Sequence, residues 1–364
     1  MTRDIYEKLR EHFNEVPTTR LRNTKELREI LHLLFTPEQA EYAIALPIAH
    51  QGRTTVEDLA EKMGRDRDEV NKNLEEMAHE GYLMVNTSRK DGKTYYALWP
   101  LMPGILESIY ADGVLSDHRR KLTKLIQKYY TNGLWNELAS SSYSQMRIIP
   151  INKNVDATSE VFSYEEMKNI IQASDIITVI PCMCRQVENK CDHLIEGDFV
   201  FGAWADYLIK YRGARQWSKE EALARMEECE KDGLVHLGAN TQSGYIQICN
   251  CCTCCCFALR GLTELHNPHS FVKSNFDPKI DHEKCNLCLT CQKICPMEAI
   301  SKLPGYEADG SDTRMLIQES QCIGCGLCAS HCPESAIQLN KARQHVPSKT
   351  VPEMMERYLS EKVW

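Results

Sequence analysis

Eight of the eighteen cysteines form two copies of one spacing near the C-terminus, and this repeat constrains the chain more than any other feature. Each copy has three cysteines at steps of three residues and a fourth cysteine four residues later, followed by proline. This spacing is typical of paired 4Fe-4S clusters in which the fourth cysteine of each run binds the other cluster. The predicted ligands are Cys285, Cys288, Cys291 and Cys332 for cluster 1, and Cys322, Cys325, Cys328 and Cys295 for cluster 2.

Zinc and disulfide bonds are the competing explanations of these cysteines. Structural zinc sites are commonly built from two separated cysteine pairs, not from three ligands at steps of three with a trailing Cys-Pro. Disulfides require an oxidising compartment, and the charged residues 1–20 contain no apolar segment that would direct export. Iron–sulfur binding is therefore the prediction, and so many free thiols indicate a reducing, anaerobic cytoplasm.

The length and charge of the chain limit the classes of function. A chain of 364 residues can form two or three domains, each with its own core. No apolar stretch approaches the roughly 18 residues of a membrane span, and the longest, at residues 176–181, has the length of a strand. The net charge of −8 disfavours attraction to nucleic acid or anionic lipid. We expect a soluble, cytoplasmic protein whose partner is a protein or a small molecule.

Residues 1–100 are predicted to form a winged-helix-like domain. Capping signals begin helices after Asn23 and Thr36, and two further helices follow up to Gly81. Two strands then flank Asp91-Gly92, a dipeptide that favours a tight hairpin turn. Helices followed by a hairpin are the order of a winged helix-turn-helix.

The charge of this domain disfavours DNA binding. Winged helices place the second helix of the pair in the major groove, and here that helix, at residues 66–80, carries six acidic and two basic residues. Neutralisation of phosphates supplies much of the affinity for DNA. The one basic spot is the wing, with Arg89, Lys90 and Lys93. We therefore expect a structural or docking role and no nucleic-acid partner.

A helical connector at residues 101–160 and a cysteine-rich α/β domain at residues 161–275 are predicted to follow. The connector contains a helical pattern at residues 119–138. The elements predicted in the α/β domain are strands at residues 175–180, 235–237 and 245–248 and a helix at residues 199–211.

Nine cysteines of the α/β domain are candidate ligands of a third metal site. They are Cys182, Cys184, Cys191, Cys249, Cys251, Cys252, Cys254, Cys255 and Cys256. An extended chain would direct Cys249, Cys251 and Cys255 to one face and Cys252, Cys254 and Cys256 to the other. A helical turn would instead gather Cys251, Cys254 and Cys255, so either geometry brings three thiols together.

Soft thiolates favour iron–sulfur clusters, zinc or copper(I) as the occupant of such a site, and a redox dithiol is the alternative. Arg185, next to Cys184, is suited to pair with a negatively charged cluster or substrate. Cys229 lies alone in a predicted helix and is expected to pack as a small hydrophobe.

The chain resembles anaerobic ferredoxin-domain proteins that join a winged-helix-like N-terminus, a cysteine-rich middle region and a C-terminal dicluster ferredoxin. The matching residues are Cys182-Met183-Cys184-Arg185, the run from Ile248 to Cys256, and the two runs between Cys285 and Cys332. The resemblance implies iron–sulfur electron transfer in strict anaerobes. In one departure, 26 residues separate Cys295 from Cys322, where Pro304-Gly305 and Asp309-Gly310 suggest an inserted hairpin.

The expected fold class is therefore a multidomain α+β protein. It ends in a bacterial-type dicluster ferredoxin domain at residues 276–345 and a helical tail at residues 346–364. The tail places Met354, Met355, Tyr358, Leu359 and Val363 within helical reach of one another. A redox protein is the expected partner, and the winged-helix domain or the tail is a candidate surface for a homodimer.

Three functions are compatible with these features. The first is an electron-transfer protein or subunit that passes single electrons through two 4Fe-4S clusters to a partner enzyme or to the middle cysteines. The second is an oxidoreductase with its own metal site at those cysteines. The third is a redox-sensing transcription regulator, which the acidic helix at residues 66–80 disfavours. Motifs for nucleotide binding or zinc-dependent proteolysis are absent from the sequence.

Overall fold

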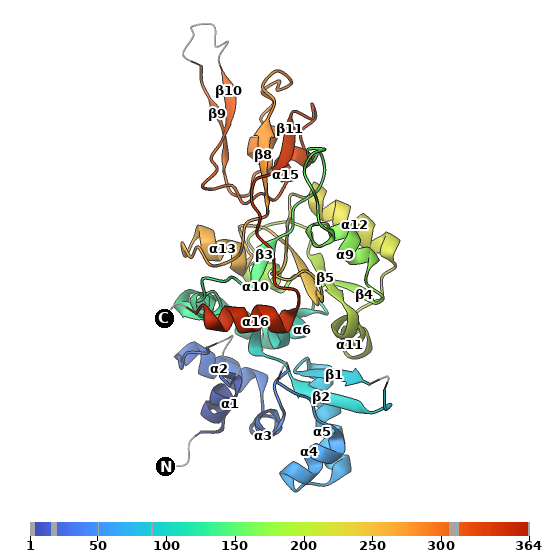
Figure 1. The fold of residues 1–364 in the computed structure, drawn as a ribbon. Helices are drawn as coiled ribbons and strands as arrows, with labels where there is room; N and C mark the ends of the chain where they lie inside the picture. Colours follow the sequence, from blue (N-terminus) through green and yellow to red (C-terminus); the bar gives the residue numbers. More distant parts are fainter. Residues whose placement is uncertain (1–3, 16–19, 50, 89, 306–312, 363–364) are drawn as a thin grey trace.

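The computed structural model describes residues 4–15, 20–49, 51–88, 90–305 and 313–362. The fold mixes helices and strands, and Figure 1 shows three parts in a row. A helical part with one hairpin lies at one end, a five-stranded sheet with its helices lies in the middle, and the C-terminal cysteine runs lie at the other end. No helix in the described ranges is both long and apolar enough to cross a membrane.

The N-terminal part contains five helices and an antiparallel hairpin. Its elements are α1 (Ile5–Phe13), α2 (Lys25–Leu34), α3 (Pro37–Ala45), α4 (Val56–Met63), α5 (Arg67–Glu80), β1 (Leu83–Thr87) and β2 (Thr94–Leu98). Thr36 and Gln39 form the capping box of α3. The predicted cap of α2 is wrong by one residue: Thr24 accepts the N–H of Leu27, whereas Asn23 bonds other side chains. Arg89 of the predicted wing lies outside the described residues.

The connector contains α6 (Leu106–Tyr110), α7 (Asp117–Tyr129) and α8 (Trp135–Leu138). The continuous helix predicted at residues 119–138 is wrong, because the chain breaks between α7 and α8. Gly133 has a φ of 120°, a conformation that glycine adopts readily and that no α-helix contains.

The middle part is built on an antiparallel sheet in the order β3-β6-β7-β5-β4. Its strands are β3 (Met146–Ile148), β4 (Ile177–Pro181), β5 (Glu196–Phe201), β6 (Val235–Ala239) and β7 (Gln247–Cys251). Its helices are α9 (Met167–Gln172), α10 (Met183–Glu188), α11 (Gly202–Arg212), α12 (Lys219–Lys231) and α13 (Phe257–Thr263). The predicted helix at 199–211 begins too early, because Phe199 and Phe201 end a strand that is paired on both sides.

The two faces of this sheet have separate cores, because side chains alternate along each strand. Val179, Phe199 and Ile248 lie on the face covered by α9 and α12, together with Met167 and Ala222. The residues on the opposite face join the large core that continues into the connector and the N-terminal part, for example Ile180, Val200, Val235 and Leu237.

The C-terminal part contains two antiparallel strand pairs and three helices. Its elements are β8 (Phe276–Ile280), α14 (Thr290–Ile294), β9 (Ile300–Leu303), β10 (Arg314–Ile317), α15 (Leu327–Ser330), β11 (Ile337–Lys341) and α16 (Val351–Ser360). The pair β9–β10 is the hairpin predicted between the two cysteine runs, although Asp309-Gly310 lies outside the described residues, as does Val363 of the tail.

Helix α16 returns from the C-terminal part to the connector (Figure 1). Met354 and Tyr358 are buried there against Tyr143, and the Tyr358 hydroxyl bonds the carbonyl of Leu138 at 3.0 Å. The apolar face of the tail is thus covered by its own chain.

Candidate metal centres

The eight C-terminal cysteines lie around two hollows of similar size. One hollow of about 350 Å³ is lined by Cys295, Cys322, Cys325 and Cys328. The other, of about 340 Å³, is lined by Cys285, Cys288, Cys291 and Cys332. Each set contains three cysteines of one run and the last cysteine of the other, which is the arrangement that the spacing predicts. Four thiols around an otherwise largely apolar hollow fit a 4Fe-4S cluster.

The two cysteine loops have the same backbone shape but different surroundings. Leu287 and Leu289 in the first loop have left-handed φ angles of 58° and 63°, and Gly324 and Gly326 occupy the corresponding positions in the second loop. A Cβ on Gly326 would lie 2.6 Å from the carbonyl oxygen of Ile151. Glycine is therefore required in the second loop, because that loop packs against the chain leading from the middle sheet.

The cysteines around the two hollows differ in exposure. Cys288 is exposed, and it is the one exposed cysteine among all eighteen. Hydrogen bonding with Thr290 lowers the pKa of Cys288, whereas burial raises the pKa of Cys325 to about 12. The carbonyl of Cys325 accepts the N–H of Ile151 at 2.9 Å. Cys288 therefore lies at the surface, whereas Cys325 lies beside the middle part. The hollow lined by Cys288 is called the outer hollow, and the hollow lined by Cys325 is called the inner hollow.

Backbone N–H groups donate to the fourth cysteine of each run. Ala299 donates to the Sγ of Cys295, and Ala336 donates to the Sγ of Cys332, both at 3.3 Å. Hydrogen bonds to ligand sulfurs are one of the means by which a protein sets the reduction potential of a cluster.

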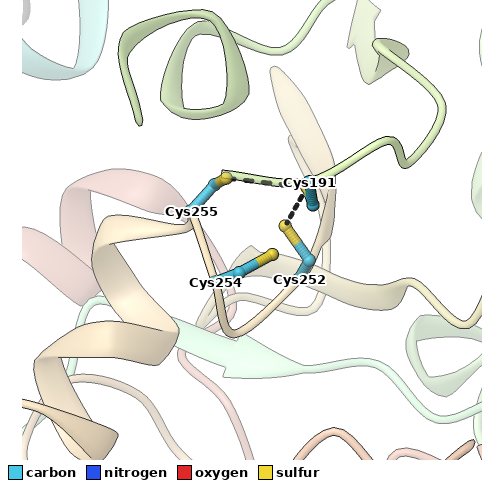
Figure 2. Close-up of side chains that lie close together, drawn as sticks. All are labelled: Cys191, Cys252, Cys254 and Cys255. Carbon is cyan, nitrogen blue, oxygen red and sulfur yellow. Dashed lines mark hydrogen bonds between the residues drawn. The ribbon is translucent and has the colours of Figure 1, made fainter. Parts of the chain in front are cut away.

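The nine middle cysteines do not form one site but two groups. In the first, the tetrathiol group, the sulfur atoms of Cys191, Cys252, Cys254 and Cys255 all lie within 4.8 Å of one another. Figure 2 shows Cys252, Cys254 and Cys255 on one turn of the chain and Cys191 on a separate segment opposite them. The Sγ of Cys191 is 3.8 Å from that of Cys252 and 3.6 Å from that of Cys255.

The second group, the cavity group, contains the other five cysteines. They line a cavity of about 1440 Å³, open to solvent, and are Cys182, Cys184, Cys249, Cys251 and Cys256. Cys184 interacts with Cys182 and Cys256, and Cys251 interacts with Cys249 and Cys256, so the five thiols are contiguous.

The separation into two groups follows from the sheet. Cys249 and Cys251 lie two residues apart in β7, so both point to the face that carries the large core. The chain leaves β7 after Cys251. The next residues turn, so that Cys252 and Cys255 join the core beneath α9 and α12 while Cys256 returns to the first face. The extended-chain prediction therefore placed Cys255 and Cys256 on the wrong faces, and the helical prediction wrongly grouped Cys251 with Cys254 and Cys255.

Arg185 is buried between the two groups. It is 3 % exposed, and its Nη1 donates to the carbonyl of Asn250 at 2.7 Å, whereas its Nε and Nη2 have no hydrogen-bond partner in the described residues. Burial lowers the pKa of Arg185, but the charges of Cys182, Asp198 and Cys252 raise it overall. Hydrogen bonding with Cys255, together with the Arg185 charge, lowers the pKa of Cys252 to about 5.

Two buried carboxyl groups that the sequence analysis did not single out line the cavity, Glu107 and Asp198. Burial raises the pKa of each to about 7, and Arg185 opposes that rise for Asp198. The signal was present, since Glu107 is the one acidic residue of α6 and Asp198 directly precedes the apolar residues 199–201 of β5. Cys229 is buried and belongs to neither group, in agreement with its predicted packing role.

Comparisons with known proteins concern the C-terminal part. Residues 284–336 match the family described as the 4Fe-4S dicluster domain. Pyruvate synthase subunit PorD of Methanothermobacter marburgensis is 32% identical over 68 residues, which are 19% of this chain and 70% of that protein. NADH-quinone oxidoreductase subunit I of Pelobacter propionicus is 33% identical over 76 residues, 20% of this chain and 39% of that protein.

An uncharacterized ferredoxin of Methanocaldococcus jannaschii is 40% identical over 55 residues, 15% of this chain and 28% of that protein. The chain therefore covers well under half the length of this ferredoxin and of subunit I. No solved structure matches the chain significantly.

Proposed function

Because the chain belongs to the family of 4Fe-4S dicluster ferredoxins through residues 284–336, we propose that it is an iron–sulfur electron-transfer protein or subunit. The observation that carries this proposal is the pair of hollows, each lined by four thiols drawn from both cysteine runs. Clusters held there would each accept and release one electron at a time. The proposed ligands are the two sets of four that the spacing predicts.

The two hollows suggest a direction for this transfer. Cys288 offers an entry at the surface, where a reduced partner protein can approach. Cys325 lies at the inner hollow, and its carbonyl is bonded to Ile151, three residues beyond the end of β3. Met146 of β3 lines the cavity that holds five of the middle cysteines. We therefore place the middle thiols downstream of the inner hollow.

The domain division that goes with this proposal follows the sequence prediction. A ferredoxin domain at residues 276–345 supplies electrons to a cysteine-rich domain at residues 161–275. The connector at 101–160 and the tail at 346–364 both contribute to the walls of the cavity, through residues such as Trp135 and Met354. We propose a reducing cytoplasm as the location, because it would keep the eighteen thiols free of disulfides.

We assign the winged-helix-like domain at residues 1–100 a structural or docking role. The C-terminal end of α5 is held by α11, where the Tyr207 hydroxyl donates to the carbonyl of Ala78 at 2.7 Å. Two basic residues of α5 are already paired with carboxylates, Arg67 with Glu57 and Lys72 with Glu76. These contacts argue against a phosphate-binding surface. Because α16 is covered by its own chain, this domain is the better candidate for a homodimer contact.

The partner is proposed from the relatives. Two of them are named as subunits of pyruvate synthase and of NADH-quinone oxidoreductase, which are redox complexes. A redox protein that docks beside Cys288 is the corresponding partner for this chain.

An oxidoreductase with its own site in the middle part is the second candidate. The cavity favours it, because a chain that only relayed electrons would have no use for a large hollow beside five thiols.

The test of the primary proposal is metal analysis and electron paramagnetic resonance (EPR) of protein purified without oxygen. The C-terminal runs should contribute about eight irons per chain, with the signals of reduced 4Fe-4S clusters. Cys288→Ala should remove about half of this iron and leave the metal of the middle part in place. A correctly folded protein with neither iron nor these signals would overturn the proposal.

A further inference from the structure

The spacing of the tetrathiol group suits a single metal ion. A tetrahedral ion with metal–sulfur bonds of about 2.3 Å holds its sulfur atoms roughly 3.8 Å apart. The separations of 3.8 Å and 3.6 Å from Cys191 match that edge, and all four sulfurs lie within 4.8 Å of one another. A 4Fe-4S cube would force the sulfurs farther apart, because its irons lie between them. Zinc or a single iron fits this group.

The tetrathiol group is also closed to other ligands. Cys252 and Cys255 are 3 % and 0 % exposed and lie in the core beneath α9 and α12. Four thiolates complete the coordination of a tetrahedral ion, which is the pattern of structural sites. A substrate therefore has no position to occupy here.

The cavity group has the opposite character. Among the described residues, its five sulfur atoms do not all lie within 4.8 Å of one another, whereas the four of the tetrathiol group do. Cys256 nevertheless interacts with both Cys184 and Cys251. Thiols that are contiguous but more widely spread suit a cluster of several irons better than one ion. All five face the cavity, so a cluster held by them would present one side to it.

The cavity is larger than a cluster needs. Its volume of about 1440 Å³ is roughly four times that of either hollow in the C-terminal part. A molecule can therefore lie beside a cluster that the five thiols hold. Much of the remaining lining consists of apolar side chains from the connector, β3, α13 and α16, among them Met102, Trp135, Met146, Phe257, Met354 and Met355.

The charges of the lining indicate what kind of molecule fits. No lysine or arginine among the described residues lines the cavity, so a carboxylate or phosphate would find neither of these cationic partners there, and His269 is the one basic side chain of the described lining. Its acidic side chains, Glu107 and Asp198, supply no positive charge, and they would repel an anion once they ionise above about pH 7. The apolar walls favour a small uncharged molecule, and a soft donor atom would suit its contact with iron.

Arg185 separates the two groups and can balance charge on both. It lies close to Cys252 of the tetrathiol group and to Cys182 and Cys251 of the cavity group. Its Nε and Nη2 are buried and have no hydrogen-bond partner in the described residues. Thiols that release their protons on binding a metal would supply negatively charged partners for these two nitrogens.

We propose that the middle cysteines build two different centres. The tetrathiol group binds one tetrahedral ion, and the cavity group binds an iron–sulfur cluster that a small, uncharged, mostly apolar molecule can reach from the cavity. This deepens the proposed function, because the electrons used at such a centre would arrive through the C-terminal hollows. The binding of metal and molecule at the two groups does not depend on that supply.

The first test counts metals in variants purified without oxygen. Cys191→Ala with Cys254→Ala should lose about one equivalent of zinc or iron and keep all other iron. Cys184→Ala with Cys251→Ala should lose several irons and keep the single ion. Cys229→Ala, a buried cysteine outside both groups, is the control and should keep every metal. Loss of the same metal in both double variants, or a middle part that binds no metal while folded, would overturn the proposal.

The second test probes the cavity with tert-butyl isocyanide, a neutral, apolar molecule with a soft carbon donor. Its addition should shift the EPR signal of the cavity centre and leave the C-terminal cluster signals unchanged. Met354→Trp, which fills the cavity from α16, should keep the iron but lose the shift. A shift that persists in Met354→Trp, or no shift in the parent protein, would refute a centre that a molecule can reach from the cavity.

The two tests also separate this inference from the proposed function. Absence of the C-terminal cluster signals, with the middle metals retained, would remove the electron-transfer role alone. Presence of those signals without cavity-group iron would remove the inference alone.

Discussion

At the scale of single residues, buried charge is concentrated beside the middle cysteines. Arg185, Asp198 and Glu107 are each less than 10 % exposed, and Asp198 and Glu107 line the same cavity. An isolated charge in such a place is costly, so carboxyl groups there tend to keep their protons. The raised pKa values of the two acids are the result, and they have a consequence for stability.

Glu107→Gln tests that consequence. The pKa of Glu107 is about 7 in the folded protein and about 4.5 when it is unfolded, so the folded state holds the proton more tightly. The contribution of this proton to the free energy of unfolding is therefore complete below pH 4.5. It falls by about 3 kcal/mol in all as the pH rises through 7. We expect the thermal midpoint of the parent protein to fall more between pH 6 and pH 8.5 than that of Glu107→Gln.

Glutamine is a suitable replacement, because its carbonyl can still accept the N–H of Gly104, now bonded to the carboxyl at 2.7 Å. Asp198 titrates in the same range, and the charge of Glu107 raises the pKa of Asp198, so the difference between the two proteins reports Glu107 together with its coupling to Asp198. Parallel pH profiles would show that the folded protein does not hold this proton.

At the scale of elements, the contact between the inner cysteine loop and the chain after β3 joins the C-terminal part to the middle part. It consists of the hydrogen bond from Ile151 to the carbonyl of Cys325 and the close packing of Gly326 on Ile151. Gly324 in the same loop is covered more closely still, since a Cβ there would lie 2.1 Å from the carbonyl oxygen of Phe276.

Gly326→Ala should weaken this junction. The residue has a φ of 84°, and the added methyl group would also meet backbone atoms of Ile151. Gly213→Ala is the matched control, because Gly213 has a φ of 69° but no atom within 4 Å of the new Cβ. Both changes strain the backbone, but Gly326→Ala should cost about 1–3 kcal/mol more. Thermal unfolding would measure it, and equal losses would mean that the junction yields without cost.

The same comparison of elements explains what sequence could predict. A short-range signal such as the capping box at Thr36 acts within a few residues, and the structure reproduces it. The ligand sets read from the two cysteine runs stay a prediction, and four thiols of each set line one hollow. The grouping of the middle cysteines depends on where the chain leaves β7 and on the position of Cys191, about sixty residues earlier. The helix predicted at residues 199–211 included the end of strand β5 for a similar reason, because apolar residues such as Phe199 and Phe201 fit either a buried strand or a buried helix.

At the scale of the whole molecule, the three parts form a row in which the middle part, with its sheet, lies between the strands β8 to β11 and the N-terminal part (Figure 1). Electrons that enter at Cys288 would reach these cysteines only after passing the inner hollow. The arrangement therefore predicts an order of events that can be measured.

Cys325→Ser tests that order. The variant weakens binding at the inner hollow but leaves the ligands of the outer one, Cys285, Cys288, Cys291 and Cys332, unchanged. With a reduced ferredoxin as donor, the outer signal should still appear, whereas reduction of the middle part should slow by at least about tenfold. Freeze-quenched EPR would follow both, with Cys229→Ala as control. Undiminished reduction of the middle part would mean that electrons bypass the inner hollow.

The position of Cys288 has a practical meaning for anyone who handles this protein in air. Oxygen meets one cysteine at the surface and finds the other seventeen partly or fully covered. Oxidation of a sample should then begin at the hollow lined by Cys288, which should bleach well before the interior loses its metal. A partly bleached preparation would be a mixture, and the metal that remains would show how far the oxidation has advanced.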